Sequence, residues 1–138
     1  MAASIVHDGL TLAVAVASTE LALYNRYSLT VAAVVGASVF IGGIYLSPDL
    51  DVVSRPYKRW GLLRWWWIGY RKWLGHRGWG HCPILGTVSR LVWTVPFWFP
   101  IIYYFRPPKI YLIVVLVGLE ISALTHYLID FFSMRRKK

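Results

Sequence analysis

The sequence is poor in charged residues and has almost no cysteine. Only 15% of its 138 residues are charged, whereas a typical soluble domain has about 25%. The single cysteine, Cys82, excludes a disulfide within the chain. The first eight residues lack the basic stretch of a secretory signal peptide, so we expect no cleaved leader. The shortage of charge excludes an ordinary water-soluble surface for a chain of this length.

Apolar and basic residues are what the sequence has instead. Hydrophobic residues account for 57% of the chain and aromatic residues for 17%, and the net charge is +9. A nucleic-acid-binding protein spreads its basic residues over a polar domain, but here they lie between apolar runs, so we expect no nucleic acid as a partner. Membrane lipids suit the apolar surface, and anionic headgroups suit the basic residues. The composition predicts an integral membrane protein.

Four apolar runs have about the length that a membrane-spanning helix needs. They cover residues 9–24, 28–46, 84–105 and 111–132. Because a span takes about 20 residues, the first run predicts a short or tilted helix. Pro96 and Pro100 are expected to kink the third run, and Gly36, Gly42 and Gly43 to permit close helix contact in the second. The sequence therefore predicts an all-α fold, with one membrane domain over residues 1–138 and a bundle of about four helices.

A segment rich in tryptophan lies between the second and third runs, at about residues 55–75. Five tryptophans fall between residues 60 and 73, interleaved with arginine and lysine. Tryptophan favours the headgroup level of a bilayer, and basic side chains extend to the same level. An aromatic core is the alternative, but a core does not readily take basic residues at this density. The pattern predicts an amphipathic segment that lies along the membrane surface.

The basic residues also predict the orientation of the chain in the membrane. With four spans, both termini and the long connection between the second and third spans share one side. Eleven lysines and arginines fall on that side, and only Arg26, Arg106 and Lys109 fall on the other. Because cytoplasmic loops carry the excess of basic residues, we expect a multi-pass protein of the cell membrane with both termini in the cytoplasm.

Histidines and acidic residues are scarce, and most lie at one end of the predicted spans. The chain has four histidines and six acidic residues. Eight of these ten form four pairs, each beside the cytoplasmic end of a span: His7 with Asp8, Asp49 with Asp51, His76 with His81, and His126 with Asp130. An up-and-down arrangement would bring all eight to one layer. Polar residues favour helix ends in general, so ordinary polar side chains in surface loops are the alternative.

The spacing of these residues favours a metal site. His126 and Asp130 are four residues apart, so both point to the same side of a helix. Pro48 is expected to end the incoming helix before Asp49 and Asp51, and the glycines at 78 and 80 permit a tight loop between the other two histidines. Imidazole and carboxylate together suit zinc above all, or manganese or iron. The sequence predicts a divalent metal centre with one or two ions.

The motifs "HDG", "SPDLD", "HRGWGHCPILGT" and "HYLID" resemble those of a family of small prokaryotic integral-membrane metal-binding proteins. That family is akin to predicted membrane-bound metal-dependent hydrolases, whose bacterial members are labelled LexA-binding. The resemblance covers nearly the whole chain and implies a helical membrane bundle. It implies ligands from among His7, Asp49, Asp51, His76, His81, His126 and Asp130. Relatives often have serine or glycine at the position of Cys82, which makes Cys82 a further candidate ligand here.

A metal at this place suggests hydrolysis of a lipid or lipid-linked phosphoester. We expect His81, His126, Asp130 and Asp49 to bind the ion directly, with His76 and His7 as further ligands. Asp51 would bind the ion or orient a ligand, and Asp8 or Asp51 would act as general base. Arg77 would bind a phosphate, although contact with lipid headgroups explains an arginine there equally well.

Three other functions fit parts of the pattern. A non-catalytic metal carrier or sensor would have the same ligands without an open position for substrate. A metal-free histidine lipid phosphatase fits the spacing in "HYLID", but its lysine-and-arginine motif and its serine-glycine-histidine motif are absent. A haem or pigment protein fits poorly, because aspartates lie beside the histidines. Glu20 and Glu120 fall outside the cluster and are read as helix-contact or far-side residues, and assembly into a homo-oligomer stays open.

Overall fold

The structure is a computed structural model that describes residues 2–74, 82 and 84–135, and these residues form helices and no strand. The all-α fold predicted from the sequence is confirmed. In chain order the elements are α1 (Ala2–Tyr24), α2 (Leu29–Ile44), the 3-10 helix η1 (Pro48–Asp51), α3 (Arg55–Arg59), the 3-10 helix η2 (Gly61–Trp65), α4 (Trp66–Leu74), α5 (Leu85–Trp93), α6 (Val95–Phe105) and α7 (Lys109–Arg135).

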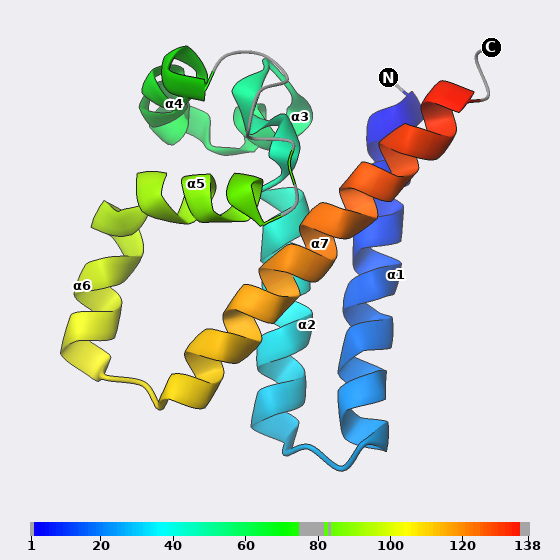
Figure 1. Cartoon of the computed structure of the whole chain (residues 1–138), viewed down its shortest axis with the longest axis vertical. Coiled ribbons are helices and arrows are strands. Elements are labelled where there is room, and N and C mark those ends of the chain that lie inside the picture. The colour runs from blue at the N-terminus through cyan, green and yellow to red at the C-terminus, as the bar shows by residue number, and fades with distance from the viewer. Residues whose placement is uncertain (1, 75–81, 83, 136–138) are drawn as a thin grey trace.

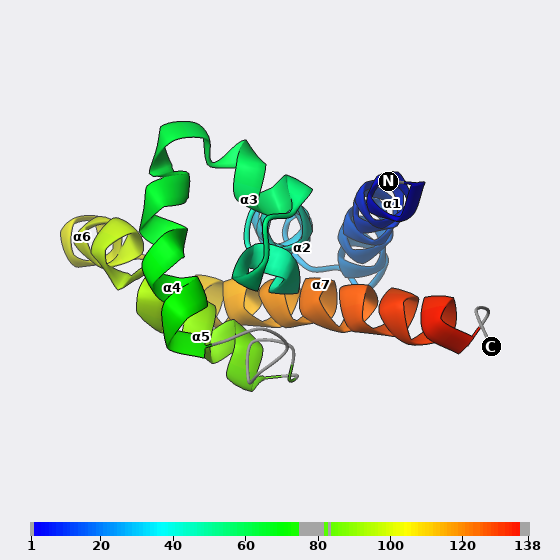
Figure 2. The same cartoon turned by 90° about the horizontal axis from the view of Figure 1, so that it is seen from above.

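Three long helices, α1, α2 and α7, form the body of the molecule (Figure 1). Helices α1 and α2 run side by side in opposite directions, and α7 crosses both. The two termini lie at the same end of this body, and α3 and α4 gather at that end as well (Figures 1 and 2). The elements that carry histidine and aspartate pairs therefore approach one another at a single end of the bundle.

Small residues let α2 approach both of its neighbours closely. A Cβ atom added at Gly118 of α7 would lie 2.6 Å from the Cβ of Ser38 and 3.0 Å from the carbonyl oxygen of Val35. On the other side of α2, a Cβ atom at Gly43 would collide with the side chain of Thr11 of α1. The close helix contact predicted from the small residues of the second apolar run is thus confirmed, and glycine is required on both sides of it.

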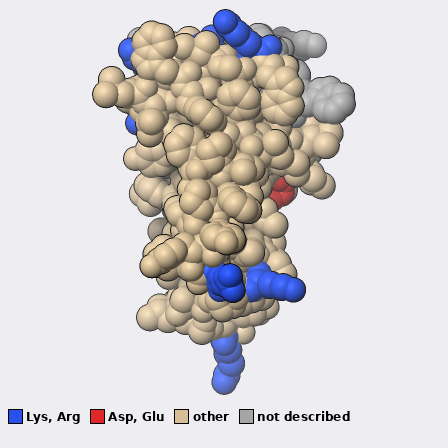
Figure 3. All heavy atoms as spheres, turned by 90° about the vertical axis from the view of Figure 1, so that its left-hand side faces the viewer, with Lys and Arg blue, Asp and Glu red and all other residues tan. Residues whose placement is uncertain are grey.

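In the part of the chain that the structure describes, three helical stretches are long and apolar enough to cross a membrane, namely Ile5–Tyr24, Leu29–Asp51 and Lys109–Ser133. Many of their large apolar side chains face outward and are exposed. Figure 3 shows lysine and arginine gathered at the upper and lower parts of one face, with an almost uncharged surface between them. This distribution is compatible with a membrane location, because the charged ends would lie at the two headgroup layers.

The third apolar run differs from the single kinked helix that the sequence predicts. It forms two helices, α5 and α6, which meet at Thr94 at an angle of 77°. The break has a local cause, because Pro96 lacks the amide hydrogen that a continuous helix would need. Thr94 ends α5 by donating from its backbone nitrogen and its hydroxyl to the carbonyl oxygen of Arg90, at 3.0 Å and 2.7 Å. Pro100 lies inside α6 without breaking it.

A carboxylate of α7 holds the start of α5. The backbone nitrogen of Ile84 donates to Oε1 of Glu120 at 2.8 Å. Farther along α5, the buried Arg90 donates to the hydroxyl of Thr87 at 3.1 Å. The contact between Ile84 and Glu120 links the start of α5 to α7, whereas Arg90 and Thr87 both lie within α5. The run from 84 to 105 is a fourth span only if the bent pair counts as one. Glu120 is therefore a helix-contact residue, as the sequence suggested.

The tryptophan-rich segment has two faces. Trp67 and Tyr70 are completely or almost completely buried, at 0% and 1% exposure, and pack with Leu50 and Tyr57 in a hydrophobic core. Trp65 and Trp73 are exposed, at 68% and 59%. The aromatic core that the sequence analysis set aside is thus present on one side of the segment. The opposite side keeps the exposed tryptophans that an interfacial segment would need.

Adding a methyl group at Gly118 should destabilise the bundle. In Gly118→Ala the new Cβ atom has to displace Ser38 or the backbone of α2, so we expect a loss of about 1–3 kcal/mol of unfolding free energy. Gly9→Ala is the matched control, because nothing lies within 4 Å of its added Cβ. The control should gain up to about 1 kcal/mol from the better helix propensity of alanine. Thermal melting in detergent, followed by circular dichroism, measures both, and equal melting temperatures would contradict the close contact.

Candidate metal centre

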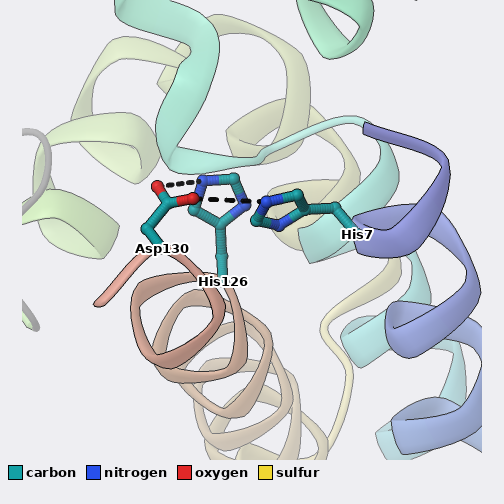
Figure 4. Close-up of side chains that lie close together, drawn as sticks. All are labelled: His7, His126 and Asp130. Carbon is teal, nitrogen blue, oxygen red and sulfur yellow. Dashed lines mark ion pairs between the residues drawn. The ribbon is translucent and has the colours of Figure 1, made fainter. Parts of the chain in front are cut away.

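Two histidines and an aspartate from opposite ends of the sequence meet at the terminal end of the bundle. His7 comes from α1, and His126 and Asp130 come from α7 (Figure 4). One ligand atom of each of the three lies within 4.8 Å of the others. Because α1 and α7 carry them, the same helix contacts that form the bundle also set the size of this cluster.

Asp130 joins the two imidazoles. Its Oδ1 lies 3.2 Å from Nε2 of His7, and its Oδ2 lies 3.4 Å from Nε2 of His126. The pair on α7 is one helical turn apart, which confirms the prediction that both side chains point the same way. The two rings are also in contact, with centroids 4.4 Å apart and an angle of 35° between their planes.

A second carboxylate reaches the cluster from η1. Oδ1 of Asp49 lies 3.4 Å from Nε2 of His126. The position of Asp49 follows from the local sequence, because Pro48 opens the 3-10 helix and Ser47 caps it by accepting the backbone N–H of Asp49 at 3.4 Å. The carbonyl oxygen of Asp49 accepts a hydrogen bond from the hydroxyl of Ser54 at 2.7 Å. This bond holds the segment that follows η1 against the turn.

Ser47 is a site residue that the sequence analysis missed. It is 1% exposed, and its Oγ lies 3.4 Å from Nδ1 of His126. When Nδ1 carries the proton and donates it to Ser47, the lone pair of Nε2 faces the two carboxylates. The signal was present in "SPDLD", because serine before proline at a helix start is a common cap. What the sequence did not reveal is that the same hydroxyl reaches a histidine 79 residues away.

The donor atoms fit a divalent cation. Nε2 of His126 and Nδ1 of His7 are buried, and neither forms a hydrogen bond with the part of the chain that the structure describes. Nε2 of His126 lies 3.4 Å from two carboxylate oxygens without being aligned to hydrogen-bond either. In a tetrahedral site with bonds of about 2.0–2.1 Å, neighbouring ligand atoms lie roughly 3.3–3.4 Å apart. His7 (through Nε2), His126 and Asp130 offer three such donors, and Asp49 lies beside His126; zinc, manganese and iron accept these donor types.

The cluster is buried on its histidine side and open on its carboxylate side. The side chains of His126 and His7 are 7% and 15% exposed, whereas those of Asp49 and Asp130 are 34% and 43% exposed. A ligand or a water molecule would therefore approach from the side of the aspartates. An open side of this kind is what a catalytic centre needs and a closed structural site lacks.

The remaining predicted residues have other surroundings. Asp8 binds Arg59 through both oxygens, with Nη1 at 3.1 Å from Oδ1 and Nη2 at 2.5 Å from Oδ2. Asp51 is buried in η1, and its carbonyl oxygen accepts a hydrogen bond from Nε of Arg71 at 3.1 Å. Their roles as general base or ligand stay predictions. Asp8 would have to be released from Arg59 before it could accept a proton.

Part of the motif "HRGWGHCPILGT" lies outside the residues that the structure describes. His76, Arg77 and His81 lie outside the described residues. Cys82 is described, and it is a free, exposed cysteine. Of the seven predicted ligands, the structure therefore brings together His7, His126 and Asp130 and places Asp49 beside them, whereas Asp51 is not part of that cluster.

Comparison with known proteins supports metal binding. A family model described as "Uncharacterized metal-binding protein (DUF2227)" matches residues 2–114. An uncharacterized protein of Aquifex aeolicus (strain VF5) is 40% identical over 57 residues, which are 41% of this chain and 40% of that protein. The chain thus matches about two fifths of the length of this relative. No solved structure matches the chain. His7 and Asp49 fall within the residues that match the family, and His126 and Asp130 lie beyond them.

Removing the charge of Asp8 should weaken the fold. Arg59 also donates to the carbonyl oxygen of Ile44 at 3.1 Å, so the pair ties α1 and α3 to the end of α2. Asp8→Asn should lower the unfolding free energy by about 1–3 kcal/mol, the usual cost of losing hydrogen bonds between charged groups. Glu20→Gln, an exposed acid on the same helix, should change it by less than about 0.5 kcal/mol. Thermal melting checks both, and an Asp8→Asn protein that melts like wild type would contradict the structural role.

Proposed function

The chain belongs to the family of uncharacterized metal-binding proteins (DUF2227), and on this premise we propose that it holds a divalent metal ion at one end of a membrane-embedded helix bundle. The ligands are His7, Asp49, His126 and Asp130. The single observation that carries the proposal is the convergence of two imidazoles and two carboxylates from α1, η1 and α7 at distances of 3.2–3.4 Å. His76 and His81 are the predicted further ligands for the same ion or a second one.

We propose that zinc is the resident metal, with manganese and iron as the alternatives. Zinc takes nitrogen and oxygen ligands in a four-coordinate arrangement, and the described residues offer three converging donors with Asp49 beside them. Manganese and iron accept the same donor types. Ser47 is proposed to act as a positioning residue, because its contact with Nδ1 of His126 fixes which nitrogen faces the ion.

The activity that we propose is hydrolysis of a lipid or lipid-linked phosphoester. A metal ion held there would supply Lewis acidity that polarises a phosphoryl oxygen and lowers the pKa of water. The exposed sides of Asp49 and Asp130 would admit the phosphoester, while the buried histidines keep bulk solvent from the other side of the centre. The cluster lies where the long apolar helices end, and lipid phosphates lie at the same depth of a bilayer.

The proposed location is the cell membrane, with the centre and both termini at the cytoplasmic face. Support comes from the arrangement of the helices, in which both termini and the tryptophan-rich segment lie at one end. Most of the basic residues that the structure describes belong to elements at that end, as expected for a cytoplasmic face. We further propose that anionic lipid headgroups contact this end.

Metal analysis of the detergent-purified protein tests the centre. Wild type should contain about one equivalent of metal or more, and His126→Ala should lose most of it. Ser47→Ala should bind metal roughly 10–100-fold more weakly, as for other groups that orient a ligand. A chelator should lower the melting temperature of wild type but not of His126→Ala, because an ion stabilises only the fold that binds it.

Glu20→Gln serves as the control and should keep wild-type metal content, since this exposed carboxylate lies at the far end of α1. Wild type that binds no metal would overturn the proposed function. Turnover of phospholipid or lipid-linked phosphate substrates should disappear with chelator and return with zinc or manganese. Full metal content without turnover would assign the protein to metal carriage or sensing instead.

Cysteine labelling tests the orientation. In a Cys82→Ser background, single cysteines at the C-terminus and in the turn at residues 25–27 should react with a membrane-impermeant reagent from opposite sides of a sealed vesicle. The reason is that α2 and α1 connect this turn to the end where both termini lie. Reaction of both positions from the same side would contradict the proposed arrangement.

A further inference from the structure

An apolar groove lies between α1 and α7 beside the proposed metal centre. Its volume is about 290 Å³, and it is lined by Leu10, Leu128, Ile129, Phe132 and Ser133. Among the described residues that line it, Ser133 alone has a polar side chain. The proposed metal chemistry does not use this groove, so the groove is available to another part of a ligand.

The groove and the metal centre are built on the same helical turns. Leu10 follows His7 by three residues on α1, and Ile129 and Ser133 lie on either side of Asp130 on α7. Residues three or four apart are neighbours on a helix surface. Ser133 lies three residues after Asp130, and Ile129 lies three residues after His126. The groove residues of α7 are therefore neighbours of the proposed ligands on the same helix. A molecule that binds the ion from its open carboxylate side can therefore reach the groove with its remaining part.

The walls of the groove belong to two helices that can cross a membrane. Leu10 lies in the candidate span Ile5–Tyr24, and the other lining residues lie in Lys109–Ser133. Three of the apolar lining side chains are exposed, with Leu10 at 41%, Leu128 at 54% and Phe132 at 60%. In a bilayer this open apolar groove would face the hydrocarbon core, and a lipid chain would enter the groove without crossing water.

Charge near the centre favours an anionic head on such a chain. Asp8, the residue after His7, is bound by Arg59 and is 3.9 Å from Nη1 of Arg55, so one carboxylate faces two guanidinium groups. Arg55 keeps 45% of its side chain exposed. The sequence continues beyond the groove into four basic residues, 135–138. This end of the molecule would attract a phosphate and repel a cationic head.

We propose that the groove binds the acyl chain of a phospholipid whose phosphate meets the metal centre. This inference rests on the proposed function and adds to it a binding site for the chain. A single-chain phosphate ester with its head at Asp49 and Asp130 and its tail along Leu10 and Phe132 would meet both parts of the site. The specificity for a lipid, rather than for a water-soluble phosphoester, then comes from the groove.

The test compares inorganic phosphate with dodecyl phosphate on protein loaded with Co²⁺ in detergent. The visible absorption of Co²⁺ reports when a phosphate reaches the centre, without any need for turnover. Wild type should bind dodecyl phosphate at least about tenfold more tightly than inorganic phosphate, because each buried methylene group favours binding by about fourfold. Transfer of dodecyl phosphate into micelles lowers this preference equally in every variant, so comparison between variants removes the effect.

Leu10→Trp fills the groove and should abolish the preference for dodecyl phosphate while leaving inorganic phosphate binding unchanged. Leu12→Trp is the matched control, since Leu12 is 53% exposed on the same helix and does not line the groove. It should bind both phosphates as wild type does. Phe132→Ala is a second variant that opens a wall of the groove at a residue that is 60% exposed, and it should weaken dodecyl phosphate binding alone.

The outcomes separate the groove from the centre. Protein that takes up no Co²⁺ would overturn the proposed metal centre and this inference with it. Co²⁺-loaded wild type that shows no preference for dodecyl phosphate, or a Leu12→Trp protein that loses as much as Leu10→Trp, would overturn the groove alone. If wild type is a dimer and Leu10→Trp is a monomer that keeps the preference for dodecyl phosphate, the groove is a contact between two copies of the chain. That result would also overturn the proposed acyl-chain site.

Discussion

The close approach of α2 to α1 and α7 is the constraint on which the rest of the structure depends. Gly43 meets Thr11 on one side, and Gly118 meets Ser38 on the other. Helices are rigid along their axes, so these contacts fix how far apart the helix ends lie. His7, Asp49 and His126 come from three different elements, and they approach to 3.2–3.4 Å of Asp130 or of one another in a bundle whose closest crossings are occupied by glycine.

The polar groups at the end of the bundle divide into two kinds. Asp8 and Arg59 satisfy each other, so the pair stabilises the junction of α1, α2 and α3. The imidazoles of His7 and His126 each keep a buried nitrogen that makes no hydrogen bond with the described residues. Such a nitrogen costs free energy, and native proteins keep few of them without a reason. A metal ion between His126 and the two carboxylates would satisfy Nε2 of His126, and this connects the surroundings of that histidine to the proposed chemistry.

The sequence predicts those parts of the fold and site that depend on local patterns. Apolar length predicts α1, α2 and α7, and the four-residue spacing predicts the shared direction of His126 and Asp130. The break at Thr94 escapes prediction, because proline marks a weak point without fixing the angle. Contacts between distant residues, such as Ser47 with His126, escape prediction for a different reason. They depend on how the helices cross, and the periodicity of the sequence does not indicate the crossing geometry.

The tryptophan-rich segment has a part in the metal centre that its composition alone does not suggest. Leu50 lies between Asp49 and Asp51, and it is completely buried against Tyr57, Trp67 and Tyr70. Fixing Leu50 in this core fixes η1, and η1 carries Asp49 toward His126. The exposed tryptophans of the same segment would lie among lipid headgroups. In a bilayer this segment would link the membrane surface to the position of a proposed ligand, so a shift of the segment in the headgroup layer would move Asp49 relative to the two histidines.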